Sequence, residues 1–216
     1  MATIVITPEA GRALFFFAVI VFVGWFAAGM MLNVRKGNAM TCWMQEGLPL
    51  IGEKTTHRWL GSSGVELKLQ NPSKPFSRVE LFILLEPRDV PFLWAYFHAR
   101  GRRDVLIVRC HTHSPRFQLE VFDPKAWTTR DLHEESGRAQ WSTIDAPGAG
   151  LIARGEGRVE NAAQLAGLAA GCGLPLVRLG IRRSAPELEV QWEISRYQTV
   201  SSRRLFENLR QIAQQL

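Results

Sequence analysis

The hydrophobic pattern of the chain changes sharply after residue 32. Residues 13–32 form an uninterrupted apolar run without Asp, Glu, Lys, Arg or His. A helix rises about 1.5 Å per residue, so this run covers about 30 Å, the thickness of the hydrocarbon core of a bilayer. In lipid every backbone N–H and C=O must be paired within the segment, which a helix achieves. The run therefore predicts a single transmembrane helix, preceded by a short extracytoplasmic tail over residues 1–12.

Polar residues on each side of the run predict where the helix begins and ends. Thr7 suits the N-cap, Pro8 the first helical position and Glu9 the positive end of the helix dipole. The predicted end is marked by polar, basic and glycine residues: Asn33, Arg35, Lys36 and Gly37. A cleaved signal peptide is the main alternative, but its apolar core usually spans about 7–15 residues. Because the run here continues to residue 32, the sequence favours a retained anchor.

The charges around the run predict its orientation. Arg12 precedes the run and is offset by Glu9, whereas Arg35 and Lys36 follow it directly. Lys and Arg tend to remain on the cytoplasmic side, so we expect a cytoplasmic C-terminal domain on a single-pass protein of a cell inner membrane. The cysteines are three in number and far apart in the chain, which fits a reducing compartment better than a disulfide framework.

The composition within the run bears on what the helix does. Gly24, Ala27 and Ala28 are small, and Gly24 and Ala28 have the four-residue spacing that lets helices approach closely. This predicts packing against other transmembrane subunits, although chance is the alternative because Gly and Ala are common in such helices. The run contains no ionisable residue, so it offers no proton relay, ion site or haem ligand.

Residues 33–64 are predicted to form a juxtamembrane connector. Its apolar residues suggest a short amphipathic piece near the lipid headgroups, where Trp is favoured. Arg35, Lys36 and Trp43 are the residues expected at the membrane interface. The alternative is a loop that packs on the domain.

Beyond the connector, the pattern predicts an α+β fold with an antiparallel sheet. Strand 65–69 alternates with period two. This strand opens the first of two expected units, 65–123 and 141–200. A polar linker over 124–140, with one helical turn at 131–136, separates them. In the first unit we expect strands 79–85, 105–113 and 117–122 around a helix at 88–99; in the second, strands 144–154, 176–182 and 188–194 around a helix at 161–170.

The matching order of elements predicts a duplication. Val108-Arg109 and Val177-Arg178 occur at equivalent places, 69 residues apart. Two β-α-β-β units would form a ferredoxin-like sheet with helices on one face. The helix at 88–99 is expected to turn its apolar residues inward: Val90, Leu93, Trp94 and Phe97. An amphipathic helix over 201–216 closes the chain and is expected to pack on its own domain.

The charge of the chain lies outside the predicted membrane helix. The net charge of +6 belongs to residues 33–216, since Glu9 and Arg12 cancel. A basic cytoplasmic domain is attracted to an anionic lipid leaflet. We predict no nucleic-acid partner, because no helix-turn-helix, zinc-finger or RNP pattern is present.

The segment Cys110-His111-Thr112-His113 is the strongest candidate for a chemical site. His111 and His113 share one face of a strand and together could ligate a metal. The favoured interpretation is a charged sheet face built from Arg109, His111 and His113 with Arg178 and Arg182, each basic strand paired with an acidic one in a hairpin. The acidic strands carry Gln118, Glu120, Glu187, Glu189, Gln191 and Glu193.

No catalytic pattern emerges elsewhere. Glycines 148, 150, 155 and 157 do not follow a phosphate-binding order, and Ser142 and Asp145 lack a recognisable His partner. We predict no cofactor and no small-molecule substrate. The sequence favours a non-catalytic, single-span accessory subunit of a photosynthetic, respiratory or secretion complex. The alternatives are a membrane-tethered metal enzyme using His111 and His113, and a peripheral module that binds anionic lipid through Arg203, Arg204 and the connector.

Overall fold

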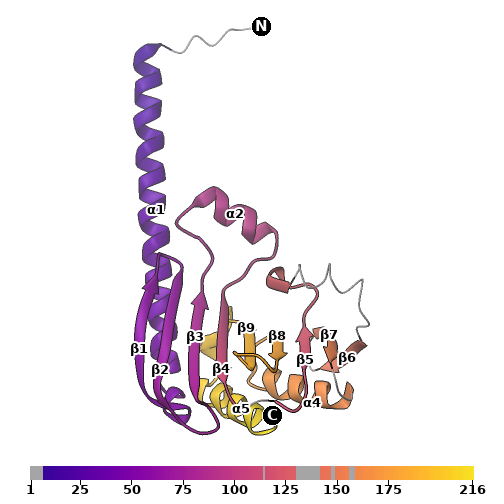
Figure 1. Cartoon of the computed structure of the whole chain (residues 1–216). Helices are drawn as coiled ribbons and strands as arrows, with labels where there is room; N and C mark the ends of the chain where they lie inside the picture. Colours follow the sequence, from indigo (N-terminus) through magenta and orange to yellow (C-terminus); the bar gives the residue numbers. More distant parts are fainter. Residues whose placement is uncertain (1–6, 114, 130–141, 147–148, 156–158) are drawn as a thin grey trace.

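A computed structural model describes residues 7–113, 115–129, 142–146, 149–155 and 159–216. In these residues an α+β domain is attached to one long N-terminal helix, as the sequence predicts (Figure 1). Residues 1–6 of the predicted tail and the helical turn predicted at 131–136 lie outside the described residues.

Helix α1 extends from Pro8 to Met44 and is long and apolar enough to cross a membrane. Its predicted start is confirmed: the Thr7 hydroxyl accepts a hydrogen bond from the Ala10 N–H at 3.3 Å, and Pro8 occupies the first turn. Its predicted end at Gly37 is wrong. A glycine costs a helix only about 1 kcal/mol, and residues beyond it, Met40 and Met44, are fully buried in the domain core. Their burial outweighs the cost of the glycine.

The predicted connector is therefore not a separate segment. Residues 33–44 belong to α1, η1 follows at Leu48–Leu50, and strand β1 occupies Gly52–Leu60. β1 forms a hairpin with β2, Gly64–Pro72, through a turn in which Gly61 has φ 70°. β1 is an edge strand of the sheet, and most of its side chains are exposed.

Nine strands of the described residues form one sheet in the order β1-β2-β3-β4-β9-β8-β5-β7-β6, and every pairing is antiparallel. The remaining strands are β3 Arg78–Leu84, β4 Val105–His111, β5 Leu119–Phe122, β6 Ser142–Ala146, β7 Ala149–Gly155, β8 Leu176–Ile181 and β9 Leu188–Glu193. The remaining helices are α2 Pro91–Ala99, η2 Trp127–Thr129, α4 Val159–Ala170, η3 Tyr197–Thr199 and α5 Ser202–Gln214.

The strand pairing does not repeat between the two predicted units. β3 pairs directly with β4, but β5 lies between the equivalent strands β7 and β8. β8 and β9 form a hairpin, whereas β4 pairs with β9 and β5 pairs with β8. From β3 onward the order of elements matches the prediction, except that the strand predicted at 144–154 is wrong: β6 and β7 are two strands that pair with each other. The ferredoxin-like duplication is not confirmed.

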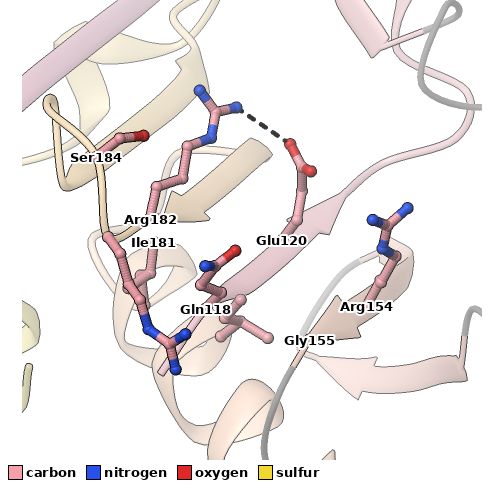
Figure 2. A pocket seen from close by; sticks show the side chains of 9 residues that line it. Gln118, Glu120, Arg154, Gly155, Ile181, Arg182 and Ser184 are labelled. Atoms are coloured by element: carbon pink, nitrogen blue, oxygen red, sulfur yellow. Dashed lines mark hydrogen bonds and ion pairs between the residues drawn. The ribbon is translucent and has the colours of Figure 1, made fainter. Parts of the chain in front are cut away.

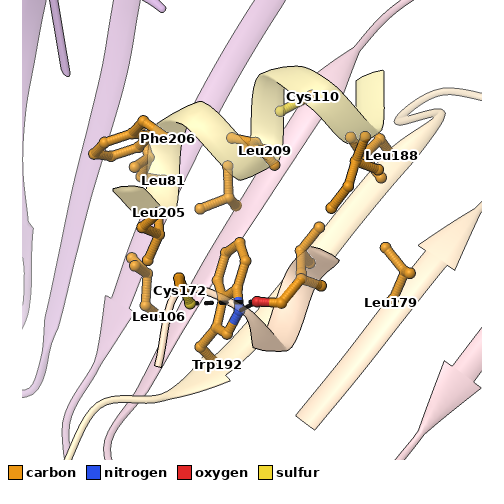
Figure 3. Packing of buried hydrophobic residues seen from close by; sticks show 14 of the residues in the cluster. Leu81, Leu106, Cys110, Cys172, Leu179, Leu188, Trp192, Leu205, Phe206 and Leu209 are labelled. Carbon is orange, nitrogen blue, oxygen red and sulfur yellow. Dashed lines mark hydrogen bonds between the residues drawn. The ribbon is translucent and has the colours of Figure 1, made fainter. Parts of the chain in front are cut away.

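The core lies between the sheet and the helices α1, α4 and α5. Trp192 of β9 is fully buried, and its indole N–H donates to the Ala169 carbonyl of α4 at 2.8 Å (Figure 3). The predicted inward stripe of the C-terminal helix is confirmed by its buried residues: Leu205, Phe206, Leu209, Ile212 and Ala213. α5 therefore packs on its own domain.

Helix α2 corrects a prediction. It lies beyond the ends of β3 and β4, beside α1, rather than on the sheet (Figure 1), and none of its residues is buried. The expected inward face fails because the buried side of the sheet is already covered by the other helices. This leaves α2 close to the apolar part of α1.

Candidate functional site

The C-terminal half of α1 contacts the domain through one stripe of residues, Gly29, Asn33, Gly37, Met40 and Met44, all buried. A Cβ at Gly29 would lie 2.2 Å from the Arg88 carbonyl oxygen, so only glycine permits this contact with the loop between β3 and α2. The stripe follows the three- and four-residue spacing of one helix face. The stripe fixes the apolar helix to the domain, and at Gly29 the helix backbone lies directly against the backbone of Arg88.

Asp104, just before β4, is the centre of a buried polar cluster at this contact. It is 3 % exposed and accepts two hydrogen bonds from the Arg88 guanidinium, 3.0 Å to Oδ1 and 2.8 Å to Oδ2. Lys36 of α1 forms an ion pair with Oδ2, and the Glu86 N–H donates to Oδ1 at 2.6 Å. Burial alone would raise the pKa of Asp104, but the hydrogen bonds and charges of Arg88 and Lys36 hold that pKa below its ordinary value.

Asn33 and Glu86 extend the cluster to both helices. The Asn33 side chain donates to the Glu86 carbonyl at 3.0 Å and accepts from Arg88 at 3.1 Å. The buried Glu86 carboxylate accepts from the Trp94 indole at 2.7 Å and lies 3.0 Å from His98 Nδ1, both on α2. We call Asn33, Lys36, Glu86, Arg88 and Asp104 the junction. It joins α1, α2 and the start of β4 into one unit.

An apolar groove opens beside the junction between α1 and α2. The Trp25 indole donates to the Arg88 carbonyl at 3.0 Å, and its ring lies 6.3 Å from that of Trp94. The groove has a volume of about 400 Å³ and is lined by Trp25, Ala28, Gly29, Leu32, Arg88 and Trp94.

The residues predicted for packing in the membrane lie in different surroundings. A Cβ at Gly24 would meet open space, Ala27 is exposed, and Ala28 lines the groove. The structure therefore leaves Gly24 and Ala27 accessible to lipid or to another helix.

The residues predicted at the membrane interface also separate. Arg35 is exposed, and Lys36 pairs with Asp104 in the junction. Trp43 packs edge-on against Tyr197 at 5.6 Å and donates to the Val200 carbonyl at 2.8 Å. Its indole therefore contacts the domain, which is the packing alternative and not the headgroup contact.

The charged sheet face is present, with its expected pairing changed in part: Arg178 of β8 lies 3.8 Å from Glu189 of its hairpin neighbour β9, but other pairs join strands that are not chain neighbours. Arg109 of β4 pairs with Glu189 of β9 at 2.9 Å, while Arg178 of β8 pairs with Glu120 of β5. Arg182 also reaches Glu120, at 3.4 Å. Burial opposes the charge of Glu189, but a hydrogen bond from Gln191 and the Arg109 charge lower its pKa. We call these paired charges on β4, β9, β8 and β5 the charge ladder.

The pairing of Arg109 with Glu189, and not with Glu120, can be tested by a double-mutant cycle. Arg109→Met and Glu189→Gln, singly and together, should give a coupling energy of about 0.5–1 kcal/mol for this cross-strand pair, because the pair is only partly buried. The measurement is urea unfolding of the full chain in mild detergent. The same cycle on Arg109 and Glu120 should give a coupling near zero, and a larger value there would contradict the observed pairing.

The two histidines proposed as metal ligands lie in different surroundings. His111 Nδ1 lies 3.8 Å from Glu187, and His113 is exposed beyond the end of β4. No group of three His, Cys, Asp or Glu side chains within the described ranges is arranged to hold a metal ion. The metal hypothesis thus gains no geometry from these residues.

A second hollow, basic in character, lies over β5, β7 and β8 (Figure 2). It has a volume of about 590 Å³, and Arg154, Arg182 and Arg183 line it together with Glu120. Sequence reasoning missed this grouping, because β5 inserts between β7 and β8 from far away in the chain. No periodicity within one strand signals such a neighbour.

The lipid-binding alternative based on Arg203 and Arg204 places its bases on α5. Arg203 pairs with Glu207 at 3.0 Å on the exposed side of this helix. α5 lies at the end of the domain away from the apolar half of α1 (Figure 1). If α1 crosses a bilayer, these arginines lie away from its surface.

Sequence reasoning also missed the junction. Gly29, Asn33 and Gly37 recur every four residues, a signal that a helix face approaches another element closely. In the sequence alone, Asn33 and Gly37 stand beside Arg35 and Lys36 and therefore predict the end of the apolar helix instead. Arg88 and Asp104 carried no local signal, because their partners lie 55 and 68 residues away on α1.

Comparison with known protein families and with curated proteins finds no match to this chain. The structure itself defines the class: an α+β domain fixed by a buried polar junction to one helix long and apolar enough to cross a membrane.

Proposed function

We propose that this chain is a non-catalytic, single-span accessory subunit of a multi-subunit membrane complex. In this role α1 packs against other transmembrane helices, and the α+β domain bridges neighbouring subunits on the cytoplasmic side of an inner membrane. The observation that carries the proposal is the junction, which holds the apolar helix rigidly to the domain. A simple tether for an enzyme needs no such fixed angle, whereas a subunit that positions neighbours does.

Two further features support this role. Only 6 % of the most apolar stretch of α1 is buried against the rest of the described chain. This leaves a helix surface for lipid and for partner helices, with the small residues Gly24 and Ala27 accessible. The ionisable groups of the junction are paired with one another, an arrangement that suits holding a geometry.

Purification from native membranes in mild detergent tests the proposal. We expect the chain to elute with other membrane subunits at a fixed ratio, and Gly24→Leu to reduce that association because a large side chain blocks close helix approach. Val19→Leu, an exposed apolar position on a different side of α1 from Gly24, is the matched control. Recovery of the wild-type chain as a stable monomer would contradict the proposal.

A further inference from the structure

Helix α2 exposes an apolar face that the described domain does not cover. Phe92 is 80 % exposed, Tyr96 51 % and Leu93 40 %. These residues lie at helical spacing on one side, together with the exposed alanines 95 and 99. A helix that is apolar on nearly every side is normally buried in a core or in a membrane. This face therefore requires an occupant.

The opposite side of α2 is fixed to the protein. Trp94 donates to the buried Glu86 carboxylate at 2.7 Å, and the Phe97 ring lies 5.4 Å from Trp127. The exposed face is thus held in one direction. Because the fold fixes the position of this face, its surroundings can be deduced from the part of α1 that lies beside it.

The part of α1 beside α2 belongs to the apolar run. Trp94 contacts Trp25, and the loop preceding α2 touches Gly29. The apolar run continues to residue 32, about 10 Å beyond Trp25 at 1.5 Å per residue. A bilayer that covers the whole run therefore also reaches the level of α2, which lies beside α1 (Figure 1).

The C-terminal end of α2 carries positive charge. Arg100 lies over the Tyr96 ring at 4.4 Å, and Arg102 lies over the Phe97 ring at 5.0 Å and the Trp127 ring at 5.1 Å. A cation–π contact leaves the charge in place, and long basic side chains extend towards lipid phosphates while their stems stay in apolar surroundings. An apolar face ending in arginines is typical of helices that lie in the membrane interface.

We infer that the exposed face of α2 enters the boundary between headgroups and acyl chains of the same bilayer that α1 crosses. The inference rests on the proposed membrane span. The occupant is lipid, because the face lies at the depth of the apolar run and ends in cationic side chains. With α1 and α2 both in the bilayer and joined by the junction, the domain has two membrane contacts that fix its tilt and rotation at the surface.

Fluorescence quenching on the full chain in nanodiscs of phosphatidylcholine and phosphatidylglycerol tests this inference. In a Cys42→Ser background, an environment-sensitive probe is attached at Phe92→Cys; a second variant, Tyr96→Cys, guards against a local effect of one label. Val19→Cys in α1 serves as the lipid control, and Gln211→Cys, on the exposed side of α5, serves as the aqueous control. Burial raises the pKa of the Cys110 and Cys172 thiols, which keeps them unreactive in the folded chain.

We expect nitroxide-bearing lipids to quench the probe at positions 92 and 96 as at position 19, and iodide to quench it about threefold less than at position 211. If position 19 is quenched by lipid but positions 92 and 96 behave like 211, the inference fails while the span stands. Protection from iodide without quenching by lipid would mean that protein covers the face, which also overturns the inference. If position 19 itself behaves like 211, the span fails and the inference fails with it.

Discussion

Replacing Asp104 with asparagine should lower the free energy of unfolding by about 3–5 kcal/mol, towards the lower end of that range. The substitution keeps the size of the side chain but removes the charge that pairs with Arg88 and Lys36. Both cations are largely buried, with side-chain exposures of 22 % and 28 %. They would be left without a counter-charge, and their remaining contact with solvent softens the loss. Urea unfolding of the full chain in mild detergent, followed by tryptophan fluorescence, measures the effect.

The pH dependence supplies a second readout of the same variant. The pKa of Asp104 is lowered in the folded chain, whereas an unfolded aspartate has a pKa of about 3.9. The stabilisation is therefore complete above about pH 4 and is lost as the pH falls through the lower, folded pKa. The difference between wild type and Asp104→Asn should shrink in acid.

Glu207→Gln is the matched control for Asp104→Asn. Its partner Arg203 is 62 % exposed and Glu207 itself 48 %, so the change should stay within about 0.5 kcal/mol. Equal losses for the two variants would show that burial of the junction adds nothing to its ion pairs.

The local parts of the fold were predictable from the sequence. The start of α1 follows from Thr7 and Pro8, and the inward face of α5 follows from the spacing of Leu205, Leu209 and Ile212. Both features depend on residues within a few turns of one helix. Such signals act on the backbone directly, through capping and through one-sided burial. The structure confirms them.

The pairing of strands was not predictable in the same way. The sequence shows that Arg109 and Arg178 lie in basic strands and that Glu120 and Glu189 lie in acidic ones. It does not show which acidic strand joins which basic strand. The expectation of hairpins pairs each basic strand with the acidic strand that follows it in the chain. Of the two hairpins expected to carry these charges, only β8–β9 forms, and β5 pairs with β8 from a distance in the chain instead of with β4.

Helix α2 shows why an apolar pattern alone does not define a core. Leu93, Trp94 and Phe97 read as an inward face on a helix expected to cover the sheet. In the structure, the C-terminal end of α1 covers part of the sheet instead, where Met40 and Met44 are buried. Which helix covers this side of the sheet therefore depends on how far α1 extends. The sequence does not show that length, because Arg35 and Lys36 after the apolar run predict that the helix ends there.

Gly29→Ala should destabilise the chain by about 1–3 kcal/mol, even though alanine favours a helix more than glycine does. The added Cβ would lie 2.2 Å from the Arg88 carbonyl oxygen, 2.5 Å from its carbonyl carbon and 2.6 Å from Asp89 Cα. All three atoms belong to the backbone, so the loop before α2 must move away from α1. Urea unfolding measures the loss, and weaker protection of the loop from protease should accompany it.

Gly24→Ala is the matched control for Gly29→Ala, because both exchange glycine for alanine inside the same helix. A Cβ at Gly24 meets nothing within 4 Å, so its effect should be neutral or slightly stabilising. If Gly29→Ala proved as harmless as Gly24→Ala, the close contact between α1 and the domain would be wrong. The rigid angle that the proposed subunit role requires would then lose its physical basis, because the hydrogen bonds of Asn33 and Lys36 depend on the same approach.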